Sequence, residues 1–141
     1  MSFAATLDLA PRVSVRLLRG LSLLHLGVGA SLPFAMEPGW AMGAVAGLLG
    51  LSWLKLRRHP ALGFGPCALT RLTWHTEGNW TLREASGRSH EAELDGGSLV
   101  HPLLLVLNFR LTAGGRRTRL IAGDELESEL MRRLRARLSQ T

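Results

Sequence analysis

The sequence lacks the residues and motifs from which most enzyme and metal sites are built. Its single cysteine, Cys67, excludes a disulfide framework and a cysteine-based metal site. Neither GxxxxGK[ST], which cradles phosphates, nor HExxH, which binds zinc, occurs in it. His90, Glu91, Glu93 and Asp95 lie close together, but on one short strand they are more typical of a solvated face than of a metal site. We therefore expect no catalytic residue, no metal, no cofactor and no enzymatic activity.

Acidic residues are scarce in the first part of the chain. Residues 1–60 hold six basic and two acidic side chains, whereas residues 61–141 hold eleven and nine. A basic protein can bind nucleic acid. Here, however, the excess lies beside apolar segments and near the end of the chain, which favours a membrane surface and excludes nucleic acid as the expected partner.

Two apolar stretches, 20–36 and 40–54, are separated only by the turn Glu37-Pro38-Gly39. As helices they measure roughly 25 Å and 22 Å, short against a hydrocarbon core of about 30 Å, so flanking residues must complete each span. Basic residues stand on both sides of the pair and only Glu37 in its turn, which predicts that both chain ends face the cytoplasm. We predict a two-helix transmembrane hairpin over 20–56. Its membrane-interface residues are Arg19, Trp40, Trp53, Lys55, Arg57 and Arg58.

Other interpretations of this hairpin are weaker. A cleaved signal peptide would need a single apolar stretch and a better cleavage site, and a remainder of about 80 residues could hardly bury two helices. A re-entrant or interfacial loop is the third alternative. Gly43 and Gly47 form a GxxxG pattern, which we interpret as close helix packing within the hairpin, with homodimerisation as the alternative. His25 is either a neutral, hydrogen-bonded imidazole or a functional group.

The hairpin divides the chain into parts. Residues 1–19 are predicted to be a cytoplasmic segment, 57–66 a linker rich in proline and glycine, and 67–141 a small cytoplasmic α+β domain. Alternating apolar residues predict an antiparallel meander of about five strands. The expected strands are 68–75, 80–84, 89–94, 103–112 and 116–122, with Gly114-Gly115 as a tight hairpin turn.

An amphipathic helix is predicted to close the domain and to cap the sheet. Asp124 is its expected N-cap, with Glu127 in a capping box. Leucines at four-residue spacing from Leu126 form its apolar stripe, which should pack on the sheet face of residues 103–111. Its late arginines form a solvated face or a surface for lipid headgroups or an acidic partner. They are Arg132, Arg133, Arg135 and Arg137.

Several segments together resemble the YgfX family, also called CptA. The hairpin closes on Lys55-Leu56-Arg57-Arg58, and paired strands follow at 69–75 and 79–84. The closest local match is Leu120-Ile121-Ala122-Gly123-Asp124 followed by Met131-Arg132-Arg133-Leu134-Arg135. These proteins are small inner-membrane toxins of type IV toxin–antitoxin pairs.

The resemblance implies a membrane-anchored module that binds proteins. The family's proposed targets are the division protein FtsZ and the actin-like MreB, whose polymerisation it inhibits, and its proposed antitoxin is the flavinylation factor SdhE. In such a pair the antitoxin protects the targets and does not bind the toxin. The alternative is a non-toxic accessory or adaptor subunit of an inner-membrane complex, linked to maturation of a flavoprotein such as succinate dehydrogenase.

Overall fold

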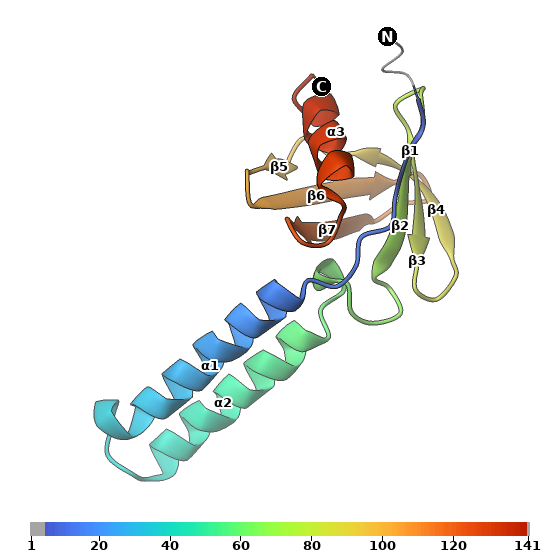
Figure 1. Cartoon of the computed structure of the whole chain (residues 1–141). Coiled ribbons are helices and arrows are strands. Elements are labelled where there is room, and N and C mark those ends of the chain that lie inside the picture. The colour runs from blue at the N-terminus through green and yellow to red at the C-terminus, as the bar shows by residue number, and fades with distance from the viewer. Residues whose placement is uncertain (1–4, 141) are drawn as a thin grey trace. The chain divides into compact units, whose positions relative to one another are not determined.

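Two separately packed units make up the chain in the computed structural model, which describes residues 5–140 (Figure 1). One unit is the helical hairpin Val15–Arg58. The other joins the residues up to Ser14 to everything from His59 onward. The segment predicted as 1–19 is therefore divided, and its residues 1–4 lie outside the described residues. The linker predicted at 57–66 contains the end of α2 and a 3-10 turn, η1 (Pro60–Leu62), which belongs to the folded domain.

The hairpin consists of α1 (Val15–Ala35) and α2 (Trp40–Arg57), which run antiparallel beside each other (Figure 1). None of their residues is buried. Within residues 5–140, α1 is the one helix long and apolar enough to cross a membrane by length and composition. The 18 residues of α2 include Lys55 and Arg57 in the last turn, which lower its mean hydropathy. Large apolar side chains cover both helices, as expected of a surface that faces lipid.

Within the described residues, the domain is an antiparallel sheet of seven strands that curls around a core and carries one α-helix, α3 (Ser128–Leu138). The order is β1-β2-β3-β4-β6, with β7 on the other side of β6 and the short β5 beside its first half. The strands are β1 (Leu7–Leu9), β2 (Leu69–Trp74), β3 (Trp80–Glu84), β4 (Ser89–Leu94), β5 (Leu99–Val100), β6 (Leu104–Leu111) and β7 (Arg116–Ala122).

The predicted fold class is confirmed, and the five expected strands correspond to β2, β3, β4, β6 and β7. Two strands escaped the sequence analysis. One is β1, which precedes the hairpin in the sequence and pairs with β2 at the edge of the sheet, and the other is β5. With three and two residues they are too short for an alternating pattern to register. The predicted turn is present, because Gly114 and Gly115 both have the positive φ angles that a tight hairpin turn requires.

The core lies between the concave face of the sheet and α3. Trp74 and Trp80 stack with their ring centroids 4.7 Å apart, and Phe109 meets Trp80 edge-on at 5.1 Å. The helix adds Met131 and Leu134 to the same core that contains Leu105, Leu107 and Phe109 of β6, so its apolar stripe faces the sheet. Leu103 departs from the expected face: the regular strand begins only at Leu104, and Leu103 is 74 % exposed.

The start of α3 differs from the prediction. The helix begins at Ser128, its N-cap position is Glu127, and no side chain caps it. Asp124 is instead engaged with Ser14, whose Oγ donates to its Oδ1 at 2.6 Å. The predicted capping box is therefore absent, since the helix begins four residues after Asp124, and the carboxylate of Asp124 instead bonds a residue 110 positions away in the sequence.

Replacing Leu134 with alanine should cost about 2–5 kcal/mol of unfolding free energy, because its side chain is fully buried between α3 and the sheet. The matched control is Leu103→Ala, which should change stability by no more than about 0.5 kcal/mol because Leu103 is exposed. Denaturant titration of the full chain in mild detergent, followed by tryptophan fluorescence, measures both. Similar losses for the two variants would contradict this account of the core.

Candidate functional site

The four arginines predicted as a partner or lipid surface do not form one cluster. Arg132 and Arg133 are exposed on α3, and both bind Glu129, with N–O distances of 3.0 and 2.9 Å. The hydrogen bonds from Arg132 and Arg133 hold the pKa of Glu129 below its ordinary value. This exposed charge group, Glu129 with its two arginines, is what remains of the predicted surface.

The other two arginines are turned toward the domain. Arg135 donates from Nη2 to the carbonyl oxygen of Pro102. Arg137 lies over the ring of Trp74, 4.1 Å from its centroid, and donates to the carbonyl oxygens of His75 at 2.9 Å and Ala5 at 3.1 Å. These contacts attach the end of α3 to β2 and to the N-terminal segment.

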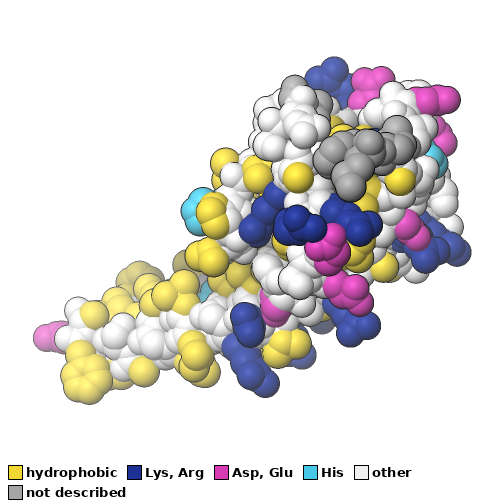
Figure 2. Space-filling model, turned by 45° about the horizontal axis from the view of Figure 1, so that its top comes forward, with side chains coloured by type: hydrophobic (Ala, Val, Ile, Leu, Met, Phe, Trp, Pro, Cys, Tyr) yellow, Lys and Arg dark blue, Asp and Glu magenta, His cyan; other side chains and the backbone are white. Residues whose placement is uncertain are grey.

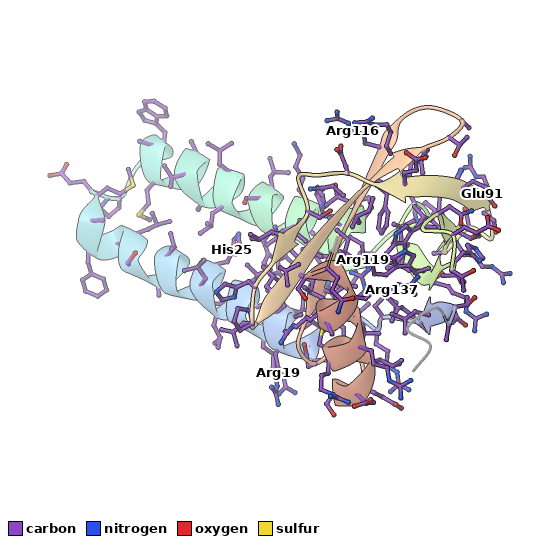
Figure 3. All side chains as sticks on the ribbon, turned by 90° about the horizontal axis from the view of Figure 1, so that it is seen from above. Arg19, His25, Glu91, Arg116, Arg119 and Arg137 are labelled. Atoms are coloured by element: carbon purple, nitrogen blue, oxygen red, sulfur yellow. The ribbon has the colours of Figure 1, made fainter. Side chains whose placement is uncertain are left out.

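Among residues 5–140, the most deeply buried ion pair joins Arg119 of β7, labelled in Figure 3, to Glu125 in the loop before α3. Both side chains are 1 % exposed, and Arg119 Nη2 donates to Glu125 Oε1 at 2.9 Å. The second carboxylate oxygen accepts the N–H of Ala122. Burial raises the pKa of Glu125 and lowers that of Arg119, whereas their attraction acts in the opposite direction. The sequence analysis missed this pair, since neither residue lies in a recognisable motif.

The chain segments that enter and leave the hairpin are both hydrogen-bonded to this ion pair. We call the four residues Arg12, Ala61, Arg119 and Glu125 the clamp. Arg119 donates to the carbonyl oxygen of Ala61 at 3.2 Å and to that of Arg12 at 3.5 Å. The N–H of Arg12 in turn donates to the carbonyl oxygen of Glu125 at 3.0 Å. At Gly63, with φ +93°, a Cβ would lie 2.8 Å from Arg119 Nη2, so the chain passes close against the guanidinium.

A second group of charged side chains lies on the concave face of the sheet, around Arg117 of β7. Arg117 Nε donates to Oε1 of Glu84 at 3.0 Å, although the two strands are not neighbours in the sheet. Ser86 donates to Oε2 at 3.2 Å, and His90 Nε2 lies 3.2 Å from Oε1. Burial alone would raise the pKa of Glu84. The hydrogen bonds from Arg117 and Ser86 and the electrostatic interactions with His90 and Arg117 outweigh the effect of burial, so the pKa of Glu84 is lowered.

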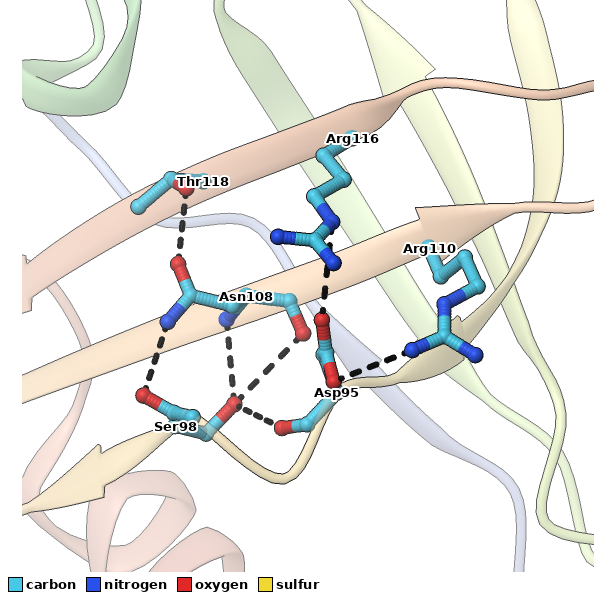
Figure 4. Close-up of polar contacts among 7 residues, drawn as sticks. Asp95, Ser98, Asn108, Arg110, Arg116 and Thr118 are labelled. Atoms are coloured by element: carbon cyan, nitrogen blue, oxygen red, sulfur yellow. Dashed lines mark hydrogen bonds and ion pairs between the residues drawn. The ribbon is translucent and has the colours of Figure 1, made fainter.

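The outer face of β6 and β7 carries a polar network that attaches the β4–β5 turn (Figure 4). Asp95 pairs with Arg110 at 3.5 Å and with Arg116 at 3.8 Å. Ser98 Oγ donates to the carbonyl oxygen of Asp95 and accepts the N–H of Asn108 at 3.0 Å. Both arginines are well exposed, so the ion pairs add little stability. The network's effect is to fix the position of the turn that leads into β5.

In the hairpin, His25 is hydrogen-bonded as expected of a satisfied imidazole. Its Nδ1 lies 2.8 Å from the carbonyl oxygen of Leu21 and its Nε2 3.5 Å from Ser52 Oγ. Trp53 donates to Ser22 Oγ at 3.3 Å, and the guanidinium of Arg57 lies 5.1 Å from its ring centroid. The remaining predicted interface residues, Arg19, Trp40, Lys55 and Arg58, are exposed near helix ends.

Gly43 and Gly47 do not pack against α1. A Cβ built on either would meet no atom within 4 Å, whereas one on Gly29 would touch Leu49 at 3.6 Å. The close approach within the hairpin is therefore at Gly29, and the packing role expected for the GxxxG pattern inside the hairpin is absent. Packing of these two glycines against another helix stays a prediction.

No group of three or more histidine, cysteine, aspartate or glutamate side chains that could hold a metal occurs among residues 5–140. A family model described as the membrane-bound toxin component of a toxin–antitoxin system, Cpta_toxin, matches residues 5–141. The chain belongs to this CptA family. No curated protein and no solved structure matches it.

The match confirms the resemblance noted in the sequence and identifies this CptA family member as membrane-bound. The segment of residues 120–124 that carried the resemblance most closely lies between the two clamp residues Arg119 and Glu125. This family-like corner is thus where β7, the N-terminal segment and the chain leaving the hairpin converge.

Removing both partners of the buried ion pair should destabilise the domain by less than the sum of the two single losses. Glu125→Gln or Arg119→Met alone should cost about 3–5 kcal/mol, because each leaves a buried group without its partner. The double variant should cost less than the sum of the single losses. Denaturant titration of the full chain in mild detergent measures all three. Additive losses would mean that the two side chains are not energetically coupled.

Glu84→Gln should destabilise the domain by about 1–3 kcal/mol at pH 7, because Arg117 loses a charged acceptor. A lowered pKa means that the carboxylate contributes stability above its ordinary value of 4.5, and that this is lost as pH falls through the folded-state pKa. The difference between wild type and variant should therefore shrink below about pH 4.5. Thermal melts across pH test this, with exposed Glu91→Gln (labelled in Figure 3) as the matched control. A difference that stays constant with pH would contradict it.

Proposed function

We propose that this protein is a non-enzymatic toxin of the inner membrane that binds division and shape-determining polymers of the FtsZ and MreB kind and blocks their assembly. Family membership over residues 5–141 is the observation that carries the proposal. The two targets come from the family resemblance. The domain offers exposed, mixed-charge surfaces, and charged surface groups set the rate and specificity of protein association more than its strength.

The proposed topology is a hairpin that spans the membrane twice, with the domain on the cytoplasmic side. The 21 residues of α1 measure about 31 Å and the 18 of α2 about 27 Å, against a hydrocarbon core of about 30 Å. Arg57 over Trp53 is the arrangement expected at a headgroup boundary. The basic residues lie at the ends of the helices that connect to the domain, and Glu37 lies in the turn. That asymmetry supports cytoplasmic chain ends.

Membrane attachment supports a binding mechanism. Division and shape-determining polymers assemble at the inner membrane, so a tethered inhibitor meets its target at a raised effective concentration and needs only modest intrinsic affinity. Arg132 and Arg133 are the residues that we propose to contact an acidic target surface. Glu129 orients both guanidinium groups and is the intramolecular partner that an acidic target would have to replace.

The alternative is a non-toxic adaptor of an inner-membrane complex, and one observation favours it. The GxxxG face of α2 makes no close contact with α1, so Gly43 and Gly47 are open to another transmembrane helix. That helix would belong to a membrane complex or to a second copy of the chain. In this case the domain would act as a scaffold, and the glycine face would be the main interface.

Expression of the full chain should make cells round or filamentous, and Arg132→Glu with Arg133→Glu should weaken inhibition of polymer assembly roughly tenfold by reversing the contact charge. The readouts are cell shape and sedimentation of purified FtsZ and MreB polymers, at matched membrane levels of each variant. Arg83→Glu, an exposed charge reversal on β3, is the control and should leave inhibition unchanged. Normal morphology at high expression, together with a stoichiometric membrane partner purified in mild detergent, would support the adaptor instead.

A further inference from the structure

One surface of the domain is apolar without an evident structural reason. Strand β5 and the turn that joins it to β6 expose Leu99 by 55 %, Val100 by 43 % and Leu103 by 74 %. We call residues 99–104 the apolar tip. Apart from Val13, these three are the exposed large hydrophobic side chains of the described domain. Every other one in residues 5–140 lies on the hairpin helices, where Figure 2 shows hydrophobic side chains along the surface.

The tip is held in place rather than loose. The N–H of His101 donates to the carbonyl oxygen of Leu104 at 2.9 Å, which closes the turn. Just before β5, Ser98 Oγ accepts the N–H of Asn108, and within the tip the carbonyl oxygen of Pro102 accepts a hydrogen bond from Arg135. Residues 99–104 include no charged side chain, so the exposed side chains of Leu99, Val100 and Leu103 form an apolar patch. A fixed, exposed apolar patch marks an interaction surface.

The tip lies at the same end of the β6–β7 ladder as the clamp. Leu104 is paired with Ala122, and the N–H of Ala122 is bound by Glu125 of the clamp. Both connections to the hairpin leave from the clamp. From Arg12 to the first residue of α1 the chain can span at most about 10 Å, and from Ala61 back to Arg57 at most about 14 Å. The end of the domain that carries the tip is therefore the end tethered close to the membrane.

We propose that the apolar tip inserts into the headgroup region of the membrane that holds the hairpin, and forms a further attachment point for the domain. The position of the tip favours lipid over a protein partner, because the end of the domain that carries it is connected to both hairpin helices by only a few residues. Arg135 beside Pro102 adds the cation that anionic headgroups attract.

Such insertion has a mechanical consequence. Both connections to the hairpin are short, and an inserted tip would restrict rotation of the domain about them. The inference depends on membrane attachment, but not on toxicity or on a particular target. Tip insertion can therefore fail while the proposed function holds, and the proposed function can fail while tip insertion holds.

Spin labels measure the depth of the tip directly. Leu103→Cys and Ala113→Cys, each in a Cys67→Ser background, carry a nitroxide in the full chain reconstituted into nanodiscs of anionic phospholipid. Ala113 lies in the exposed turn at the opposite end of β6 and is the matched control. The label at 103 should collide more with oxygen, which concentrates in lipid, than with a water-soluble nickel chelate. The label at 113 should show the reverse order.

Two results would overturn the proposal. One is equal nickel access at positions 103 and 113 in the nanodiscs, which would leave the tip in water. The other is a label at 103 that is accessible in pure lipid and becomes protected only when a purified protein partner is added, which would assign the tip to protein binding. Because Leu103 is exposed, its substitution should leave the fold intact, and an unchanged melting curve checks this.

Discussion

The buried ion pair between Arg119 and Glu125 is the constraint on which the rest of the structure depends. Removing two charges from water is unfavourable, and the attraction between them offsets this cost only where further hydrogen bonds to the buried groups are present. Here the guanidinium of Arg119 donates to the carbonyl oxygens of Arg12, before the hairpin in the sequence, and of Ala61, after it. The carboxylate of Glu125 accepts the N–H of Ala122 at the end of β7. The same bonds that compensate the buried charges thus bring together chain segments that the hairpin separates by more than forty residues, and they fix where the membrane anchor enters and leaves the domain.

Periodicity predicted most of this fold, and its failures have a common cause. Strands β2, β3, β4, β6 and β7 and the apolar stripe of α3 could be recognised because packing against one core imposes a local repeat. Features that depend on distant residues left no such repeat. Asp124 has the composition and position of a helix cap, yet Ser14 binds it from the far side of the hairpin. On β7, alternation shows that Arg117 and Arg119 share a face, but three arginines in four residues look solvent-facing, and only the partners Glu84 and Glu125 make the inward arrangement stable.

The candidate surfaces were predictable to the extent that lipid or helix geometry determines them. Apolar stretches bounded by basic residues follow from the solvent properties of a bilayer, and the segment could be recognised without any knowledge of the domain. The late arginines of α3 could not be sorted in the same way. Arg132 and Arg133 differ from Arg135 and Arg137 only through the positions of Trp74 and Pro102, which are remote in sequence. The apolar tip was hidden for a related reason: Leu103 and Leu104 continue the apolar run of a core strand, and only the bend before β6 separates one from the other.

The clamp and the proposed insertion of the tip would together control the orientation of the domain at the membrane. A domain free to rotate on a flexible tether loses that freedom when it binds a polymer, and the loss weakens binding. The clamp shortens both connections, and an inserted tip would remove the remaining rotation before any target is met. The rotational freedom of the domain would then already be lost at the membrane, so binding of a target would not have to remove it. Surface charges such as those of Arg132 and Arg133, which contribute little affinity alone, could then be sufficient for recognition at the membrane surface.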